Sequence, residues 1–318
     1  MNNRKEYKYL CPFKFLFLFF ISLILFKCDG RSIIDREVYL PGPEILVSDG
    51  SSNIQPCWHP AGHSIVFTSI PDLTGKDNFD ANRASEFFGT ESVIKEFSIK
   101  NHQIKTLVDI SGDACFPAYS PDGEKLLYCS DENGNFDVFK LNLKDGSVIS
   151  ISRDNGNESC PRWSPDGQQI AYINEGRLVL ADTLGENKQY ASKINSKVIS
   201  FCWSLDGREI IFSGNSDRGV EIYQYTLNTK RVKLLGGERI FGNSPAIGFP
   251  SPEKFATIGP QLAFEKKAGI YLYSFEQKTM DKAIDLGKMP SWSPDGKQLA
   301  FSNGGNIIAA TVWVGIND

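Results

Sequence analysis

Two histidines in the segment H-P-A-G-H, His59 and His63, are four residues apart, a spacing that can hold a metal ion when both rings lie on one face of a helix. The repeats described below place both of them on a hairpin turn instead. His102, in the polar run K-N-H-Q, is expected in a solvated loop. We therefore predict no metal site and no bound cofactor.

Four aspartates stand in conspicuous S-P-D-G or S-L-D-G phrases and could each act as a catalytic carboxylate: Asp122, Asp166, Asp206 and Asp295. A catalytic phrase is needed once, whereas this phrase recurs. In S-P-D-G, the fixed φ of Pro suits the second position of a type I turn, and Gly can finish the turn with a positive φ. We therefore interpret these aspartates as turn residues, together with the glycines that follow them: Gly123, Gly167, Gly207 and Gly296.

Cysteine and serine chemistry is not indicated either. The spacing of the five cysteines after residue 28 fits no C-x-x-C pair and no zinc pattern, and we expect buried free thiols at Cys57, Cys115, Cys129, Cys160 and Cys202. The sequence has no G-x-S-x-G elbow and no α/β region for a Ser-Asp-His triad. We predict that the protein is not an enzyme. The alternative is an enzyme or a carbohydrate-binding protein that uses the mouth of a central channel.

A repeat determines which elements carry these residues. Six copies align with successive separations of 61, 44, 40, 44 and 45 residues, on Trp58, Tyr119, Trp163, Trp203, Ile247 and Trp292. Short β-forming segments flank each turn, and a third and a fourth strand follow in most copies. Four strands in a period of about 40 to 45 residues indicate a β-propeller blade.

We therefore predict an all-β fold, a six-bladed β-propeller of four-stranded blades over residues 43–318. The sequence ends soon after the third strand of the sixth copy (307–314), and no blade precedes the strand-like segment 44–48. We expect this N-terminal strand to complete the last blade and close the ring, which leaves no splayed blade. Trp292 is expected to pack between blades.

The phrases P-S-W-S-P-D-G-K-Q-L-A-F-S (290–302) and P-R-W-S-P-D-G-Q-Q-I-A-Y-I (161–173) closely resemble the WD40-like repeat of TolB-type propellers, the periplasmic proteins of the Tol envelope system. The resemblance covers nearly all of residues 43–318. It implies the propeller fold and a partner such as a peptidoglycan-associated lipoprotein or another envelope component. TolB carries an additional N-terminal α/β domain, for which residues 29–40 leave no room, so the Tol role itself does not follow.

The first 27 residues predict export. Four basic residues lie within residues 1–14, and the apolar run 15–26 would span about 18 Å as a helix, short of the roughly 30 Å hydrocarbon core. Such a pattern is typical of a signal peptide. Cys28 is predicted to carry a lipid, as in bacterial lipoproteins, although Phe26 and Lys27 replace the small residues usual before such a Cys. Cleavage by an ordinary signal peptidase is the alternative.

Residues 28–42 would then form a tether, and the protein would be a periplasmic or outer-membrane lipoprotein of the cell envelope. Without residues 1–27 the chain has 29 basic and 37 acidic residues, a net charge of −8. It has no basic tract that could follow a phosphate backbone, so nucleic acid is excluded as a partner. We predict a monomer that binds another protein, either an envelope lipoprotein or a host matrix protein.

The first period is about 17 residues longer than the others, and the excess lies between Ser69 and Val93. Loops of this length are often functional. Aromatic residues and Arg dominate binding hot spots, so the loop predicts four partner contacts, at Phe79, Arg83, Phe87 and Phe88. The alternative is a loop that folds over the propeller face and buries its own aromatic side chains.

Overall fold

The computed structural model describes residues 38–39, 43–73, 79–191, 194–217, 219–235, 243–248, 261–266, 269–275 and 278–314. The predicted signal peptide (1–27) and the predicted lipid-attachment residue Cys28 lie outside the described residues, as does the tether apart from Val38 and Tyr39. Among the described residues, no helix is long and apolar enough to cross a membrane.

The S-P-D-G phrase forms the turn between the first and second strands of a blade. Gly167 donates its amide to the Ser164 carbonyl at 2.9 Å and has a φ of +70°. Asp166 Oδ1 accepts hydrogen bonds from Ser164 Oγ at 2.6 Å and from the Gln168 amide at 3.0 Å. The Asp166 carboxylate thus makes its hydrogen bonds within the turn. The same bonds recur at three further turns: Ser120–Gly123, Ser204–Gly207 and Ser293–Gly296.

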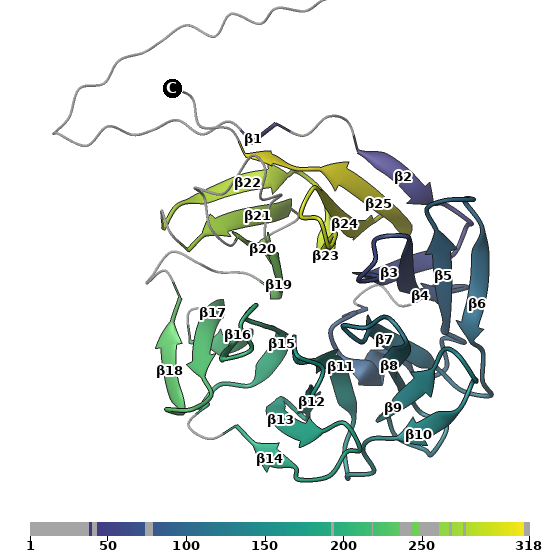
Figure 1. Ribbon diagram of the computed structural model, residues 1–318, viewed down its shortest axis with the longest axis horizontal. Helices are drawn as coiled ribbons and strands as arrows, with labels where there is room; N and C mark the ends of the chain where they lie inside the picture. Colours follow the sequence, from purple (N-terminus) through teal and green to yellow (C-terminus); the bar gives the residue numbers. More distant parts are fainter. Residues whose placement is uncertain are drawn as a thin grey trace, which may run out of the picture. The chain divides into compact units, whose positions relative to one another are not determined.

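Each turn starts a four-stranded antiparallel sheet, and the strands follow chain order from the centre of the ring outwards in blades 1 to 5 (Figure 1). Blade 1 contains β3 (Ser52–Trp58), β4 (Ser64–Ile70), β5 (Val93–Ser98) and β6 (Ile104–Val108). Blade 2 contains β7 (Ala114–Tyr119), β8 (Lys125–Ser130), β9 (Asp137–Asn142) and β10 (Val148–Ser150). Blade 3 contains β11 (Glu158–Trp163), β12 (Gln169–Asn174), β13 (Arg177–Asp182) and β14 (Gln189–Tyr190).

Blade 4 contains β15 (Val198–Trp203), β16 (Glu209–Ser216), β17 (Gly219–Thr226) and β18 (Arg231–Leu234). Blade 5 contains β19 (Asn243–Gly248), β20 (Gln261–Lys266), β21 (Gly269–Ser274) and β22 (Met280–Ile284). Inner strands of neighbouring blades contact one another all the way round, including β23 of blade 6 with β3 of blade 1. The predicted all-β, six-bladed propeller is therefore confirmed.

Blade 6 contains β23 (Lys288–Trp292), β24 (Gln298–Asn303), β25 (Asn306–Thr311) and β2 (Glu44–Val47) as its outermost strand. The pairs Glu44↔Ala309 and Ile45↔Ile308 fix the register of β2, and Val47 is buried. This confirms that an N-terminal strand closes the ring. A second join was not predicted: β1 (Val38–Tyr39), within the predicted tether, pairs with β26 (Trp313–Val314). The predicted strand 307–314 is accordingly divided between β25 and β26.

Neighbouring blades also meet through their turns and their tryptophans. A Cβ atom on Gly167 would lie 3.7 Å from Cδ of Pro121, and one on Gly207 would lie 3.5 Å from Cδ of Pro165, so successive turns touch. Trp292 of blade 6 packs, as expected, against residues of blade 5 such as Leu272. These contacts explain why the phrase recurs: it builds a hairpin and also the join to the blade before it.

Candidate functional site

The inner strands line a narrow channel. In four of them the residue before proline has a φ between +53° and +57°, and the pairing register shifts there: Gln55, Phe116, Cys160 and Met289. A residue other than glycine held in this region costs about 1–3 kcal/mol, so the surrounding sheet must enforce it. All four residues line a channel cavity of about 50 Å³, together with Arg162 and Phe201. A space of that size holds little more than water, so a larger ligand would bind at a channel mouth.

Residues 79–92 of the long loop of blade 1 cross one of these mouths, and Gln55 holds them there. The side-chain Nε2 of Gln55 donates a hydrogen bond to the Ala81 carbonyl at 2.6 Å. The side-chain Oε1 of Gln55 accepts hydrogen bonds from Thr68 Oγ1 at 2.7 Å and from the backbone amide of Phe116 at 2.8 Å. One buried side chain in the channel therefore connects the loop to blades 1 and 2. We call the side of the ring that carries this loop the loop face.

A second attachment holds the end of the loop. The buried carboxylate of Asp113 accepts hydrogen bonds from the Gly89 amide at 2.7 Å, from Thr90 Oγ1 at 2.7 Å and from the Ser92 amide at 2.9 Å. Between the two attachments lies the short 3-10 helix η1 (Ala84–Phe87). Its Phe87 ring is 0 % exposed and packs edge-on to Phe116, with ring centroids 5.5 Å apart.

The four predicted contact residues are therefore divided between the core and the surface. Phe87 anchors the loop in the core. Phe79 is half-buried, with its ring centroid 5.0 Å from that of Phe87, as expected for a loop that buries its own aromatic side chains. Phe88 is 40 % exposed, with its ring centroid 4.8 Å from that of Phe136. The Arg83 side chain is 64 % exposed. Arg83 and Phe88 are the two that a partner can reach on the described surface.

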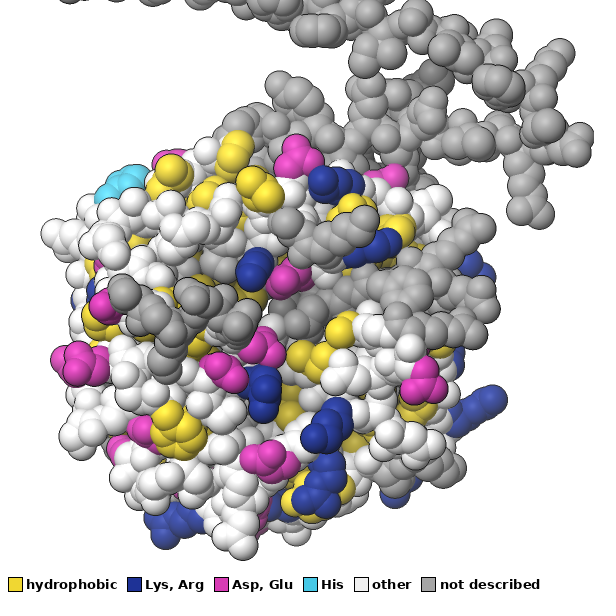
Figure 2. Space-filling model, turned by 180° about the vertical axis from the view of Figure 1, so that it is seen from behind, with side chains coloured by type: hydrophobic (Ala, Val, Ile, Leu, Met, Phe, Trp, Pro, Cys, Tyr) yellow, Lys and Arg dark blue, Asp and Glu magenta, His cyan; other side chains and the backbone are white. Residues whose placement is uncertain are grey.

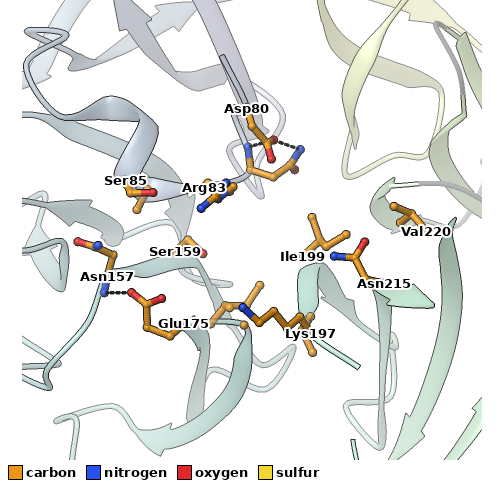
Figure 3. Close-up of a pocket in the computed structure, with 15 residues that line it drawn as sticks. Asp80, Arg83, Ser85, Asn157, Ser159, Glu175, Lys197, Ile199, Asn215 and Val220 are labelled. Atoms are coloured by element: carbon orange, nitrogen blue, oxygen red, sulfur yellow. Dashed lines mark hydrogen bonds between the residues drawn. The ribbon is translucent and has the colours of Figure 1, made fainter. Parts of the chain in front are cut away.

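Two pockets of about 490 Å³ each lie beside the loop on this face, and Asp80 and Asn82 line both of them. The first, here called the Arg83–Lys197 pocket, lies between the loop and blades 3 and 4 (Figure 3). The second lies between the loop and blades 5 and 6, where Phe79, Leu286 and Lys288 contribute to its wall. The loop thus divides the channel mouth into two compartments.

The face drawn in Figure 2 is chemically mixed. Acidic and basic side chains are interspersed across it, and hydrophobic side chains lie scattered among them. Such a mixture is common on protein surfaces and does not by itself mark an interface. It differs from the continuous basic stripe of a nucleic-acid-binding surface.

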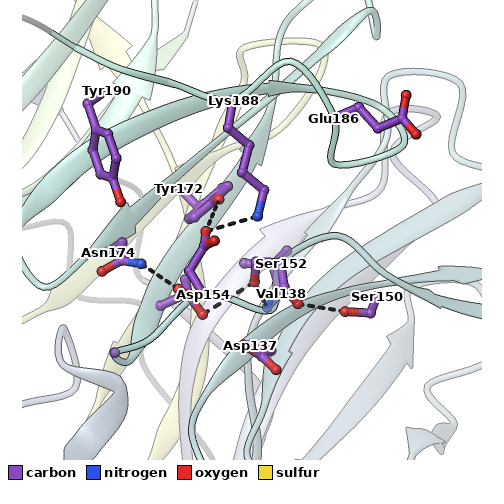
Figure 4. A network of polar contacts seen from close by, with 12 residues as sticks. Asp137, Val138, Ser150, Ser152, Asp154, Tyr172, Asn174, Glu186, Lys188 and Tyr190 are labelled. Atoms are coloured by element: carbon purple, nitrogen blue, oxygen red, sulfur yellow. Dashed lines mark hydrogen bonds and ion pairs between the residues drawn. The ribbon is translucent and has the colours of Figure 1, made fainter.

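A polar network includes Glu158 and Asn174, whose sequence neighbours line the Arg83–Lys197 pocket. Asp154 accepts hydrogen bonds from the Tyr172 hydroxyl at 3.1 Å and from Lys188 Nζ at 2.9 Å (Figure 4). Beneath it, Glu158 Oε1 accepts a hydrogen bond from Asn174 Nδ2 at 2.7 Å. Burial, and then the neighbouring carboxylate of Asp137, raise the pKa of Glu158 to about 9, so Glu158 is protonated at neutral pH.

Cys160 and the three histidines lie in the core or on turns of the fold. Burial raises the pKa of the Cys160 thiol to about 11, which leaves little of the reactive thiolate at neutral pH. His59 and His63 stack on the first turn of blade 1 with ring centroids 3.9 Å apart, and His59 Nε2 lies 3.3 Å from the Gly123 carbonyl. His102 is exposed on the β5–β6 turn. Among the described residues, no three His, Cys, Asp or Glu side chains group in a way that could hold a metal ion.

Sequence reasoning missed the residues that form this site. Gln55 and Asp113 hold the loop from positions outside it, and Glu175 and Lys197 line the pocket from two different repeats. A weak signal exists for the pair Glu175–Gly176, because two residues between two strand patterns predict a tight turn that could project a neighbouring side chain. The others carry no local signal.

Comparison with known proteins is consistent with this fold. Residues 84–177 match the family model described as the TolB beta propeller domain. No curated protein matches the chain significantly. Among solved structures, TolB from Acinetobacter baumannii is similar with a TM-score of 0.59 and 17 % identity, over 78 % of this chain and 59 % of that one. This chain therefore spans less than two thirds of that TolB.

Two further structures are similar over most of their length. A putative TolB from Agrobacterium tumefaciens aligns with a TM-score of 0.59 and 17 % identity, over 86 % of this chain and 93 % of that one. An oligogalacturonate lyase in complex with manganese aligns with a TM-score of 0.54 and 12 % identity, over 88 % and 98 % of the two chains. Identities this low establish the shared fold alone. The chain is therefore a closed six-bladed β-propeller, and residues 84–177 are similar to the TolB beta propeller domain.

Proposed function

We propose that this chain is an exported, non-catalytic docking protein whose loop face binds another protein of the bacterial cell envelope. The observation that carries the proposal is the attachment of the loop. Gln55, Asp113 and Phe87 fix residues 79–92 across the channel mouth, while Arg83 and Phe88 remain at the surface. A contact surface ordered before binding loses less conformational entropy when the partner arrives.

The partner we propose is a peptidoglycan-associated lipoprotein or another envelope component, in keeping with the TolB-type fold. A host matrix protein is the alternative partner if the chain is displayed on the outer surface. In either setting the propeller acts as a monomer, anchored through a lipid on Cys28. Metabolic labelling with radioactive palmitate tests the anchor: the label should disappear in Cys28→Ala, and label that persists in this variant would refute it.

Crosslinked pull-down from native envelopes tests the docking role. Bait carrying Arg83→Ala and Phe88→Ala should capture the partner at least about tenfold less well than the parent, because the two substitutions remove an exposed Arg and an exposed aromatic contact. Tyr190→Ala is the matched control, since Tyr190 is also an exposed aromatic residue, 48 % exposed, but lies on the outer strand of blade 3. Equal recovery with all three baits would contradict a role for the loop face.

Carbohydrate binding or catalysis at the channel mouth is the second candidate. Two pockets of about 490 Å³ favour it, and Phe79 and the acidic residues Asp80 and Glu265 are among the residues that line the second. The similar structure that is an oligogalacturonate lyase suggests acidic oligosaccharides as the probe. Calorimetric titration with oligogalacturonate should give no heat of binding if the protein is a docking module, whereas saturable binding or chain cleavage would favour this second candidate.

A further inference from the structure

The Arg83–Lys197 pocket contains two cations and two carboxylates whose bonding differs. Asp80 Oδ1 accepts hydrogen bonds from the Asn82 amide at 3.1 Å and from Asn82 Nδ2 at 3.2 Å. Glu175 Oε1 accepts the Asn157 amide at 2.9 Å. Both carboxylates therefore already have donors from the protein, as the dashed lines in Figure 3 show.

The two cations, Arg83 and Lys197, are less well paired with other described residues. Arg83 approaches a carboxylate only at 3.9 Å, that of Glu86, a distance too long for a strong ion pair. Lys197 Nζ has neither an ion pair nor a hydrogen bond to any other residue that the structure describes. The two side chains enter the pocket from opposite sides, Arg83 from the loop and Lys197 from blade 4 (Figure 3). An incoming anion would find two cationic donors available.

The position of Lys197 is built into the fold. Its aliphatic stem crosses the β12–β13 turn, where a Cβ on Gly176 would lie 3.1 Å from Lys197 Cβ and 3.2 Å from its Cγ. Glu175 and Gly176 both have positive φ, at 49° and 80°, as a two-residue hairpin turn requires. The turn therefore has a glycine where the lysine stem needs the space.

The rest of the lining indicates what kind of molecule the anion belongs to. Two partly exposed aliphatic residues, Ile199 and Val220, contribute apolar surface, and Asn157 and Asn215 contribute amides. No aromatic residue is among the described lining, so the pocket has no ring on which a sugar or a base could stack. Aliphatic surface, amides and two cations suit a peptide with an acidic side chain next to an aliphatic one.

We propose that the Arg83–Lys197 pocket binds an acidic side chain of the partner protein, with the carboxylate between the Arg83 guanidinium and the Lys197 ammonium and a neighbouring aliphatic residue against Val220 and Ile199. This inference rests on the proposed docking function and specifies its chemistry. Charge-assisted hydrogen bonds to two cations are strong and specific for a carboxylate.

A direct test uses blocked dipeptides as probes in an NMR titration of the whole folded protein. N-acetyl-Leu-Glu-amide should shift the amide signals of Gly176 and Lys197, whereas N-acetyl-Leu-Gln-amide and N-acetyl-Leu-Lys-amide should not. Arg83→Gln and Lys197→Gln should each raise the dissociation constant at least about fivefold, because each removes one cationic donor. Lys144→Gln is the matched control, since Lys144 is an exposed lysine on the β9–β10 turn. Equal shifts with the Gln and Glu peptides, or none at millimolar concentrations, would overturn the proposal.

The pull-down separates this proposal from the docking function itself. Bait carrying Lys197→Glu should recover at least about fivefold less partner than the parent, since charge reversal places like charges together. If this bait recovers the partner undiminished while the double variant at Arg83 and Phe88 does not, the pocket assignment fails and the docking function stands. If no bait recovers a partner but the Glu peptide binds selectively, the docking function fails, and only the selectivity of the pocket for a carboxylate stands.

Discussion

Replacing Glu158 by Gln should make the stability of this protein much less dependent on pH. Glu158 is 0 % exposed, between blades 2 and 3, and its carboxyl group is hydrogen-bonded to that of Asp137, which is 2 % exposed. Burial raises the pKa of both groups. The nearby cation, Lys188, forms its ion pair with Asp154. Glu158 therefore keeps its proton, which it can donate to Asp137.

The sign and the size of the effect follow from the two pKa values of Glu158. A carboxyl with a pKa near 4.5 in the unfolded chain and about 9 in the folded protein binds more protons when folded at every pH between these values. Its contribution to stability is therefore complete below about pH 4.5 and is lost as the pH rises towards 9. Each pKa unit corresponds to about 1.4 kcal/mol, so the parent should lose up to about 4 kcal/mol between pH 5 and pH 8 through this one group.

The glutamine side chain in the Glu158→Gln variant cannot ionise, but it can still accept from Asn174 and donate to Asp137. Urea unfolding of the parent and of Glu158→Gln at pH 5, 6, 7 and 8 tests this account. The two proteins should be about equally stable at pH 5, and the variant should be more stable by several kcal/mol at pH 8. The groups around the pair, Asp154, Lys188 and Tyr172, are common to both proteins, so the difference between the two curves reports on the pair of Glu158 and Asp137. Parallel curves for the two proteins would refute a proton held on Glu158.

Three further substitutions test the closure of the ring and the attachment of the loop. Val47→Ala should lower the free energy of unfolding by about 2 kcal/mol because Val47 is buried in the closing strand. The control Ile45→Ala, at a 58 % exposed position, should change the free energy of unfolding by less than about 0.5 kcal/mol. Similar losses in the two variants would mean that β2 does not pack as described. Gln55→Ala should lower the free energy of unfolding by about 1–3 kcal/mol because it leaves the buried Phe116 amide without its acceptor. Hydrogen exchange should accelerate in residues 79–83, and unchanged exchange would mean that Gln55 does not hold the loop. Asp113→Ala should cost about 3 kcal/mol in urea unfolding and accelerate exchange at residues 89–92; a stability equal to the parent would remove the second attachment.

The ring could be predicted from the sequence because the turn of most blades is specified by residues within the turn. The turn after Trp163 is specified within Ser164–Gly167, and similar residues recur at the corresponding turns of blades 2, 4 and 6. The closing strand could be predicted because 44–48 is an outer-strand pattern without a blade of its own. The pairing of β1 with β26 could not, since two-residue strands have no periodicity that could reveal them.

The candidate site could be located only roughly. The length of the first repeat marks the loop, but its path depends on hydrogen bonds from Gln55 and Asp113, which lie outside it and act only once the blades are assembled. Phe87 and Phe88 are neighbours of the same type, yet one is buried and the other 40 % exposed. Phe87 is the last residue of η1, and the chain leaves the helix at Phe88, which has a φ of −50° and a ψ of 121°. Lys197 lines the same pocket as Arg83 although more than a hundred residues separate them in the sequence, and no local pattern encodes this arrangement.

Photocrosslinking in living cells tests the central claim that the loop face binds an envelope protein. A photoreactive phenylalanine derivative replaces Phe88 on the loop face in one strain and Tyr190 on the outer strand of blade 3 in another, two aromatic positions of similar exposure. The claim predicts one discrete crosslinked envelope protein from position 88 and none from position 190. The same adducts from both positions, or no adduct from position 88, would contradict it.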